Sequence, residues 1–590
     1  MTPTVNPYNE ISRVSFIVMR ALRTPLMTLL IVYSIAILGM SFIPGIVLDG
    51  KVQYLSIFHS FYFMTYTATT TGFGEIPVPF SNAQRMWAIA CLYISVVTWF
   101  YALGSTVRLF QNTIFIRAVD ELRFARSVRR ISGPFYIVCG FGDTGSVLVR
   151  GINDAGLNVV VIDHDEERIQ ALALRNYRGT VPGLCADASI PNYLIEAGLL
   201  SASCKAVVSI TSNEEVNLKI SAMVRLLNPS VGIITMSKEK SFEETLAALG
   251  GEVHIVDPFK TFARVLNACI NNPEFYALNN WLVGDKQSSL ETYVHPPVGR
   301  WIICGYGRMG MEANHALTKN GVRTSVIDPH SRKRDEEIET YIVGGTNATT
   351  LKMAGIDKAV GILAAANDDG CNLSVLLNAR SMNPNLFTIV RQNSHKSELA
   401  FTMADADMIM QPTLVTARKI LLLLIAPLLK HFFRYLLAKE EGRSEVVTQL
   451  IAKLRRKISD QKPLLITIDF TAEKSSAVID CLNAGKEVLL GHIITDPRNR
   501  EKELDIVAFV IKSGEKETVL PTADYSISAG DQLLLCGTAK AKQLLKSNIN
   551  SEYTLSYLRT GKYPAMGYFM IWYEKHFSKQ VEKKQTNEKM

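Results

Sequence analysis

Charged side chains are absent from two long stretches of this 590-residue chain. None occurs from Pro25 to Leu48 or from Met86 to Val107, and Arg85 and Arg108 bracket the second stretch. Each stretch exceeds the roughly 20 apolar residues that cross a bilayer as a helix. The first is not expected to be a cleaved leader, because it lacks a small-residue cleavage site and a second span follows it. A wholly soluble protein is therefore excluded.

Cysteine is sparse and shows no ligand spacing. The nine cysteines include no CxxC pair and no His/Cys spacing that suits zinc, so we expect reduced core residues of a cytosolic region. The net charge of +8 is modest, and its basic residues gather near the apolar stretches without an aromatic stripe. Nucleic-acid binding is not supported by this pattern.

Between the two apolar stretches lies the octapeptide Thr67-Ala-Thr-Thr-Thr-Gly-Phe-Gly74. It resembles the T-x-T-T-x-G-[YF]-G signature of potassium channels, in which stacked backbone carbonyls replace the hydration shell of the ion. Glycine suits this role, because aiming successive carbonyls at one axis needs backbone angles that a Cβ penalises. A Thr/Gly-rich extracellular turn is the alternative, which the flanking spans disfavour. The expected filter residues, of which the first four hold K⁺, are Thr70, Thr71, Gly72, Phe73 and Gly74.

The surroundings of the octapeptide fit a pore. The segment before it, Tyr54–Thr67, is apolar and aromatic but too short to cross a bilayer, as expected of a re-entrant pore helix. No helix with regularly spaced arginines precedes the pore, so a voltage sensor of the usual kind is not expected. Both ends of the chain are expected in the cytoplasm by the positive-inside rule. The arginines that support this orientation are Arg13, Arg20, Arg23, Arg108, Arg117, Arg123, Arg126, Arg129 and Arg130.

The rest of the chain contains a duplication. A buried-strand pattern runs into G-x-G-x-x-G at Phe135–Gly145, and again into the same glycines at Trp301–Gly310. A second strand follows in each copy and ends on Asp163 or Asp328, 23 residues after the first glycine. This spacing allows a carboxylate to accept from a ribose hydroxyl in a Rossmann-like fold.

The likeness between the copies continues beyond the glycines. Asn217-Leu218 resembles Asn372-Leu373, and a last strand reaches Pro258 in one copy and Pro412 in the other. Alternating strands and helices of this kind predict parallel sheets covered by helices on both faces. The segment Leu464–Leu545 is instead rich in strand-like patterns.

Together these parts resemble the prokaryotic ligand-gated potassium channels with two tandem RCK (regulator of K⁺ conductance, TrkA-N/TrkA-C-like) domains, over nearly all of the chain up to about Lys540. The resemblance implies a two-span α-helical pore in the cell membrane, a homotetramer among lipids, and eight cytosolic α/β Rossmann-like domains in a gating ring. A β-rich C-terminal lobe completes the expected fold. The expected parts are a cytosolic N-terminus (1–24), a pore domain (25–107, with spans 25–48 and 86–107 and a pore helix and filter 54–75), a linker (108–133), a first RCK domain with crossover and connector (134–299), a second nucleotide-binding lobe (300–412), its helical crossover and C-terminal lobe (413–545) and a tail (546–590).

The resemblance also implies a regulatory nucleotide, NAD(H) or ADP, in one or both lobes. Arg308 follows the second glycine of its copy, where a guanidinium reaches a pyrophosphate held by helix amides, whereas Asp143 stands there in the first copy. The alternative that the lobes keep their glycines only for tight helix packing remains open. The expected nucleotide-binding residues are Gly305, Gly307, Arg308, Met309, Gly310 and Asp328 in the second copy, and Gly140, Gly142, Gly145, Asp163 and Asp187 in the first, with Asn347 as the counterpart of Asp187.

Calcium is another ligand that such rings bind. The archaeal calcium-gated members carry acids where this chain has Thr235-Met-Ser-Lys238, which argues against the same site. A different Ca²⁺ site stays open, although acids at helix starts are usually complements of the helix dipole. The acids in question are Glu214, Glu215, Glu239, Glu243 and Glu244.

Other classes of protein fit less well. A membrane-anchored dinucleotide-dependent oxidoreductase leaves the octapeptide unexplained, and no substrate domain offers an obvious His or Tyr acid, so we expect no catalytic residues and no enzyme. A regulatory subunit of a K⁺ transporter would not need its own filter. The apolar run Ile420–Leu429 invites a third span, but it is short, contains Pro427 and precedes basic residues, so we expect a buried helix that pairs the domains.

Gly104 is the first glycine of the second span, close to its cytosolic end. Many relatives bend this helix at a glycine near its middle, where this chain has Ile94. Because glycine leaves the backbone freer than other residues do, we expect a gating bend at Gly104. The alternative is that Gly104 only permits close helix packing.

Overall fold

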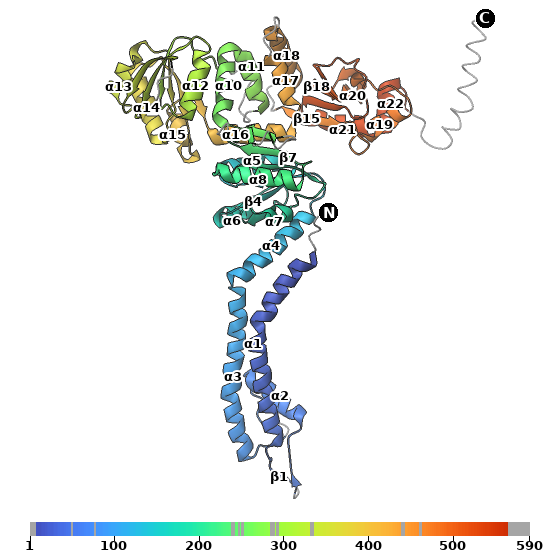
Figure 1. Cartoon of the computed structure of the whole chain (residues 1–590). Helices are drawn as coiled ribbons and strands as arrows, with labels where there is room; N and C mark the ends of the chain where they lie inside the picture. The colour runs from blue at the N-terminus through green and yellow to red at the C-terminus, as the bar shows by residue number, and fades with distance from the viewer. Residues whose placement is uncertain are drawn as a thin grey trace, which may run out of the picture. The chain divides into compact units, whose positions relative to one another are not determined.

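The structure, a computed structural model, describes residues 7–48, 51–75, 78–237, 253–283, 294–330, 336–437, 443–459 and 463–563, with a few single positions between them (Figure 1). The chain divides into two compact units, which are described separately. One unit comprises residues 1–133, 160–169 and 181–201, and the other comprises residues 134–159, 170–180 and 202–590.

Three helices form the apolar part of the first unit. They are α1 (Pro7–Phe42), α2 (Ile57–Ala68) and α3 (Asn82–Phe110), and α1 and α3 run side by side with the short α2 against them (Figure 1). By length and composition Ser15–Phe42 and Asn82–Phe110 can each cross a membrane. The two predicted spans are therefore confirmed, with a short helix between them.

The bounds of α1 differ from the expected span 25–48. The helix begins at Pro7 and continues through the arginines that precede the apolar run, because charge limits burial in lipid and does not end a helix. It ends at Phe42 because Ile43 precedes Pro44, and the residue before a proline is disfavoured in helical geometry. The short strands β1 (Val47–Leu48) and β2 (Lys51–Val52) then pair antiparallel.

The second span starts earlier than predicted and is followed by another helix. The Ser81 hydroxyl accepts from the Gln84 amide, and the Gln84 side chain accepts from the Ser81 amide. This capping box explains why α3 starts at Asn82. The expected linker contains α4 (Thr113–Arg129), whose N-cap is Asn112. In this unit α4 packs against β5 (Gly183–Cys185) and α7 (Pro191–Glu196).

The two glycine-rich copies fold into parallel sheets of the same topology. The strand orders are β5-β4-β3-β6-β7-β8 and β11-β10-β9-β12-β13-β14, so the third, second, first, fourth, fifth and sixth strands follow one another in both. The remaining elements of the first copy are β3 (Phe135–Cys139), β4 (Asn158–Asp163), β6 (Cys204–Ser209), β7 (Gly232–Met236), β8 (Val253–Val256), α5 (Asp143–Asp154), α6 (Glu166–Leu174) and α8 (Glu214–Leu227).

Alternate residues of the second sheet pack on opposite helix layers. Trp301 and Ile303 of β9 lie in one core with α12, while Ile302 and Cys304 lie in the other with α13 and α14. The elements of this copy are β9 (Arg300–Cys304), α12 (Arg308–Thr318), β10 (Arg323–Asp328), β11 (Ile338–Val343), α13 (Ala348–Met353), β12 (Gly361–Ala364), α14 (Asp369–Met382), β13 (Phe387–Arg391), α15 (Glu398–Met403) and β14 (Met408–Met410).

Each copy leaves its sheet through a pair of crossover helices. These pairs are α10 (Pro258–Asn271) with α11 (Pro273–Val283), and α16 (Pro412–Ile425) with α17 (Leu429–Leu437). The apolar run that invited a third span is bent by 112° where Pro427 separates α16 from α17. Because α16 packs on α5 and Leu429, Phe432 and Leu436 are buried in the soluble core, this run pairs the two copies.

The C-terminal lobe is an antiparallel sheet between two cores. Its strand order is β15-β20-β18-β19, with α18 (Arg443–Ile458) on one face. The other elements are β15 (Leu464–Asp469), α19 (Ser476–Asn483), α20 (Leu490–Ile494), β16 (Thr495–Asp496), β17 (Asn499–Glu503), β18 (Ile506–Ser513), β19 (Lys516–Val519), β20 (Gln532–Gly537), α21 (Ala539–Asn550) and α22 (Glu552–Thr560). Of the expected tail, residues 564–590 lie outside the described residues.

Candidate ion filter and nucleotide site

The sign of the backbone angle φ alternates along the end of the octapeptide after α2. Thr70, Gly72 and Gly74 have φ values of 60°, 69° and 88°, while Thr71 and Phe73 between them do not have positive φ. In a regular strand, successive carbonyls point to opposite sides. Reversing the sign of φ at every second residue turns successive carbonyls toward the same side. A column of oxygens on one side is what an ion filter requires.

Aromatic and charged contacts hold this segment in place. The Tyr66 hydroxyl donates to the Gly74 carbonyl, and the Phe73 ring lies 5.5 Å from the Tyr66 ring, edge to face. Directly after the segment, Glu75 accepts two hydrogen bonds from Arg85, with Nε to Oε1 at 2.9 Å. The bidentate pair ties the C-terminal end of the segment to the start of α3. This end of the segment is therefore anchored within the same chain.

In the second copy, the glycine-rich turn brings the start of α12 close to the end of β9. Gly305 has φ +95°, and a Cβ on Gly310 would lie 2.2 Å from the Gly305 carbonyl oxygen. Gly307 is the N-cap of α12 and offers no side chain to its first amides. The N-terminus of a helix with amides unoccupied by a cap is a ready site for an anion.

Asp328, the expected ribose ligand, supports this turn. Its Oδ2 accepts from the Tyr306 amide at 2.6 Å and its Oδ1 from the His330 amide at 2.9 Å. The residue is only 5% exposed. The carboxylate therefore holds the glycine turn as well as standing where the sequence places a ribose acceptor.

Two arginines from different elements share one aromatic ring. Arg308 at the start of α12 and Arg391 at the end of β13 place their guanidinium carbons 5.2 and 5.0 Å from the centre of the Phe259 ring, which α10 contributes. Arg308 also lies 3.9 Å from a carboxylate oxygen of Glu214. The second copy thus gathers two cations near the free end of a helix.

Arg391 is incompletely satisfied where it lies. Its Nη1 donates to Asn367 at 2.7 Å, but its Nε is buried without a hydrogen-bond partner among the described residues. Burial lowers the pKa of Arg391 and the charge of Arg308 lowers it further, while Asp369 acts in the opposite direction. An anion between the two guanidiniums would relieve both their repulsion and the unmet donor.

Asp369 belongs to the wall of this site. Burial alone would raise the pKa of Asp369, but hydrogen bonds from Asn393, Ser397 and Ser394 outweigh that effect and hold its pKa below the ordinary value. Its Oδ1 accepts from the Asn393 amide at 2.7 Å. The carboxylate is therefore engaged in ordering the loop after β13.

The matched asparagines of the two copies have a common structural role. Asn372 accepts from the Ala366 amide and donates to the Arg391 carbonyl, and Asn217 makes the same pair of bonds with Thr211 and Met236. These bonds align Met236 with Arg391. The arginine of the second copy has no cationic counterpart in the first.

The first copy keeps the glycine geometry with different charges. A Cβ on Gly145 would lie 2.1 Å from the Gly140 carbonyl oxygen, and Gly142 is the N-cap of α5. Asp163 ends β4 and accepts from the Asp165 amide. The two remaining positions carry acids as well: Asp143 is the first residue of α5, and Asp187 accepts from the Ser189 amide before α7.

Sequence reasoning missed Arg391 and Phe259. The available signal for Arg391 was a cation at the carboxyl end of the apolar strand Phe387–Arg391, the edge at which parallel sheets collect their ligands. Phe259 follows a proline in the crossover helix of the other copy, and only the tertiary fold brings it here. Asn347, the expected counterpart of Asp187, is the N-cap of α13 and accepts from the Thr350 amide.

No group of three or more His, Cys, Asp or Glu side chains suited to a metal occurs in the part of the chain that the structure describes. Of the acids considered for Ca²⁺, Glu214 is next to Arg308, and Glu239 and Glu243 lie outside the described residues.

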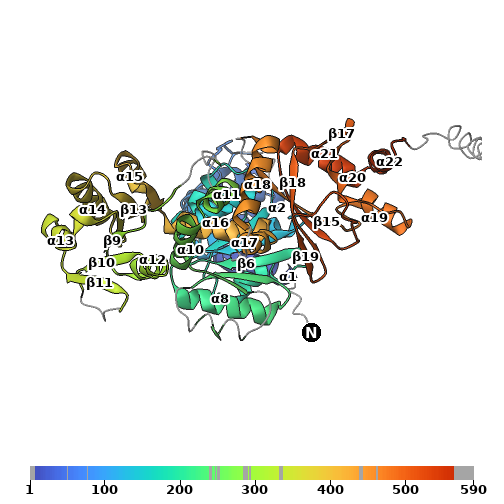
Figure 2. The same ribbon diagram turned by 90° about the horizontal axis from the view of Figure 1, so that it is seen from above.

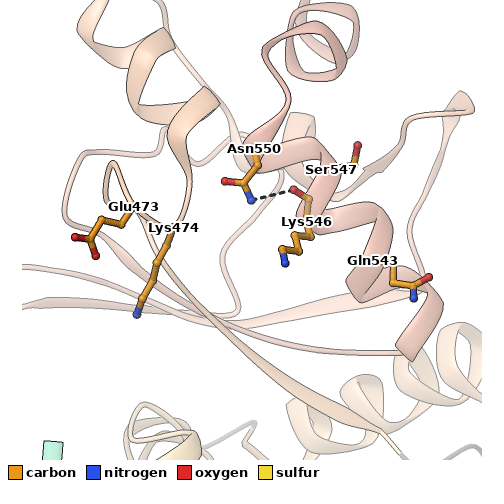
Figure 3. A pocket seen from close by; sticks show the side chains of 6 residues that line it. All are labelled: Glu473, Lys474, Gln543, Lys546, Ser547 and Asn550. Carbon is orange, nitrogen blue, oxygen red and sulfur yellow. Dashed lines mark hydrogen bonds between the residues drawn. The ribbon is translucent and has the colours of Figure 1, made fainter. Parts of the chain in front are cut away.

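A hollow on the C-terminal lobe is a weaker candidate. It has a volume of about 630 Å³ (Figure 3). Its polar groups are used within their own elements, because Asn550 donates to the Lys546 carbonyl and Lys474 pairs with Asp469. The residues that line it are Glu473, Lys474, Gln543, Lys546, Ser547 and Asn550.

Comparison with known proteins supports the division into pore and lobes. Residues 24–112 match the ion channel family, and residues 136–257 and 301–412 match the TrkA-N domain family. Potassium channel protein 1 of Methanocaldococcus jannaschii is 26% identical over 42% of this chain and 65% of its own length. Probable potassium channel protein 2 of the same organism is 28% identical over 25% of this chain and 45% of its own length. The chain thus spans less than two thirds of these curated relatives.

Solved structures with similar folds include channels. The structure named GsuK channel bound to NAD is 16% identical, with a TM-score of 0.47, over 91% of this chain and 99% of its own. The structure named GsuK bound to ADP is 20% identical, with a TM-score of 0.44, over 70% of this chain and 99% of its own.

The close contact in the glycine turn predicts that alanine destabilises the lobe at Gly310 but not at Gly307. Gly310→Ala should lower the free energy of unfolding of the second lobe by about 1–3 kcal/mol, because its Cβ would overlap the Gly305 carbonyl. Gly307→Ala is the matched control, since a Cβ there meets nothing within 4 Å. Thermal unfolding of the purified full-length variants measures both, and equal stability of the two would contradict the assignment.

Proposed function

We propose that this member of the prokaryotic RCK-containing potassium channels conducts K⁺ selectively, under the control of an adenine nucleotide that its lobes bind on the cytosolic side. K⁺ conduction is supported by the alternating sign of φ along Thr70–Gly74, a segment that lies between two candidate membrane spans. One chain supplies one column of carbonyls, whereas an ion must be surrounded. Four identical chains around the axis complete the filter, with both termini in the cytoplasm.

The second lobe is the proposed nucleotide site. Its start of α12, with Arg308 and Arg391 beside it, offers amides and two guanidiniums to phosphate oxygens. Asp328 stands at the end of the neighbouring strand β10, where a carboxylate accepts from ribose. These groups fit ADP or NAD(H), whose phosphates the two arginines would hold and whose ribose the carboxylate would orient.

The first lobe is less suited to a phosphate. Asp143 replaces Arg308 at the start of its helix, and Met236 replaces Arg391 at the end of its fifth strand. A carboxylate beside phosphate is repulsive. We therefore assign the regulatory nucleotide to the second lobe and a mechanical role to the first.

Contacts of the second site reach elements of the first copy. Glu214 begins α8 and Phe259 lies in α10, and both touch Arg308. A bound phosphate competes with the Glu214 carboxylate for Arg308, so binding alters the contact between the copies. A ligand shifts a conformational equilibrium only through such differential contacts. In a tetramer, eight lobes coupled in this way form the ring that acts on the pore.

Filter geometry predicts the effect of a larger residue at Gly72. Gly72→Val should abolish K⁺ flux, because a β-branched residue at φ +69° is strained by about 1–2 kcal/mol and distorts the carbonyl column. The added Cβ meets no atom of its own chain within 4 Å, so the chain should still fold, and we expect tetramers to form. Liposome flux assays and size-exclusion chromatography test this. Equal Na⁺ and K⁺ permeability of the unaltered protein would refute the filter.

The phosphate site predicts graded losses of affinity. Arg308→Ala and Arg391→Met should each weaken ADP binding by about 10- to 100-fold, the loss expected from one charge-assisted hydrogen bond of roughly 1.5–3 kcal/mol. Arg323→Ala, at the opposite end of β10, should bind as the parent does. Calorimetry on the full-length protein measures all three.

A substitution at Glu214 should change ADP affinity in the opposite direction. Glu214→Gln should tighten ADP binding, because it removes the competing carboxylate, whereas Glu215→Gln on the exposed neighbour should not. Absence of ADP and NAD(H) binding, or parental affinity in both arginine variants, would remove the nucleotide from this lobe.

Gating is proposed to bend α3 at Gly104. No atom lies within 4 Å of a Cβ built there, so packing within one chain does not require the glycine. Gly104→Ala, which stiffens the helix by about 0.5–1 kcal/mol, should change nucleotide-dependent open probability and leave K⁺ selectivity intact. Single-channel recording decides the matter: unchanged gating in this variant, with Val97 or Tyr101 variants controlling closure, would place the gate higher.

A further inference from the structure

A cavity of about 440 Å³ lies among the crossover helices, apart from the residues assigned to the nucleotide site. It is lined by α10 and α11 of the first copy and by β14, α16 and α17 of the second, which Figures 1 and 2 show gathered together. We name it the crossover pocket. Its size falls within the range of small-molecule sites.

Apolar side chains form the body of the crossover pocket. Phe275 and Phe433 meet edge to face with their ring centres 5.5 Å apart, and Val265, Met410 and Leu422 extend the surface. Such a lining favours a ligand with an apolar body.

The polar part of the pocket is entirely cationic or neutral. Among the described residues that line it none is acidic, and Tyr276, whose pKa burial raises to about 12, offers a protonated hydroxyl. The basic residues that line it are Arg264, Arg418, Lys419, Lys430 and Arg434. Cations in this number around an apolar cavity repel one another unless an anion is present.

Lys419 and Arg418 are half-buried, whereas Arg264, Lys430 and Arg434 are exposed. Burial of Lys419, together with the charges of Arg264 and Lys430, lowers its pKa. Within the described ranges no carboxylate lies within ion-pairing distance of its ammonium group. A half-buried ammonium without a counter-ion is less stable than a paired one, which points to a partner from outside the chain.

We propose that the crossover pocket binds an amphipathic anion, a molecule with one carboxylate or phosphate group on an apolar chain. The head group pairs with Lys419 and the rim cations, and the chain lies against Phe275, Phe433 and Leu422. Because α10 and α16 belong to different copies, the ligand bridges them and favours one of their relative arrangements. This site is independent of the nucleotide in the second lobe.

The test uses decanoate as the probe and Lys419 as the reporter, with the full-length protein in lipid nanodiscs. Reductive methylation by formaldehyde and cyanoborohydride is followed lysine by lysine with peptide mass spectrometry. Decanoate at about ten times its Kd should slow methylation of Lys419 about tenfold by mass action. Methylation of Lys352 on α13 and Lys540 on α21, which do not line the pocket, should keep its rate.

Two matched molecules separate charge from apolar contact. Decanol, which enters lipid but carries no charge, and acetate, which carries the charge without the chain, should not protect Lys419. Protection by decanol equal to that by decanoate would refute anion recognition, and equal protection by acetate would refute the apolar part. No protection by any probe would overturn the site.

Variants provide a second measurement. Lys419→Met keeps the apolar stem and removes the charge. In this variant, the protection of Lys430 from methylation by decanoate should fall by at least the factor by which decanoate slows methylation of Lys419 in the parent. Lys352→Met is the control and should leave the protection of both pocket lysines unchanged. Thermal unfolding of each variant establishes that it is folded, and full protection of Lys430 in Lys419→Met would contradict the proposal.

Discussion

The contact between the Gly305 carbonyl and Gly310 fixes the geometry on which the proposed nucleotide site depends. With no room for a Cβ, the first turn of α12 lies directly against the end of β9. Its free amides therefore meet the carboxyl edge of the sheet, where β10 ends on Asp328 and β13 on Arg391. Parallel sheets bind ligands at this edge because helix starts and strand ends converge there. The same contact recurs between Gly140 and Gly145, so the duplication preserved the framework and varied the charges.

Those charges support the different roles proposed for the two copies. Arg308 and Arg391 share the Phe259 ring, and the charge of Arg308 adds to burial in lowering the pKa of Arg391. Glu214 offsets part of that repulsion from an element of the other copy. The arrangement stores an electrostatic preference for an anion and connects it to the interface between the copies. The corresponding positions of the first copy, Asp143 and Met236, contain no such preference.

Much of the architecture follows from patterns that operate within short segments. The uncharged runs identified both spans, and the repeated glycines with an acid 23 residues later identified two Rossmann-like sheets. The resemblance to RCK-containing potassium channels is confirmed by the ion channel and TrkA-N matches, and several of the curated relatives are named as potassium channels, which disfavours the oxidoreductase. Helix bounds were less predictable. The length of an apolar run reflects the thickness of the membrane and not the full length of the helix. The helix α1 therefore begins at Pro7, ahead of its apolar run, and the expected linker contains α4.

Residues brought together by tertiary structure were beyond the reach of sequence reasoning. Phe259 and Arg391 are separated by more than a hundred residues, and no local periodicity links them. Asp328 was expected to meet ribose, and the structure adds its bonds to the Tyr306 and His330 amides. Local spacing predicts which chemical groups end a strand, whereas their shared surroundings depend on how the helices pack.

Single-channel recording in symmetric K⁺, with ADP added to the cytosolic face, is the most direct test of K⁺ conduction under nucleotide control. We expect a K⁺ current whose open probability changes with ADP while its unitary conductance stays constant, and a current that does not respond to ADP when Arg308 and Arg391 are both replaced. Absence of K⁺ current, or the same response to ADP in that double variant, would contradict it.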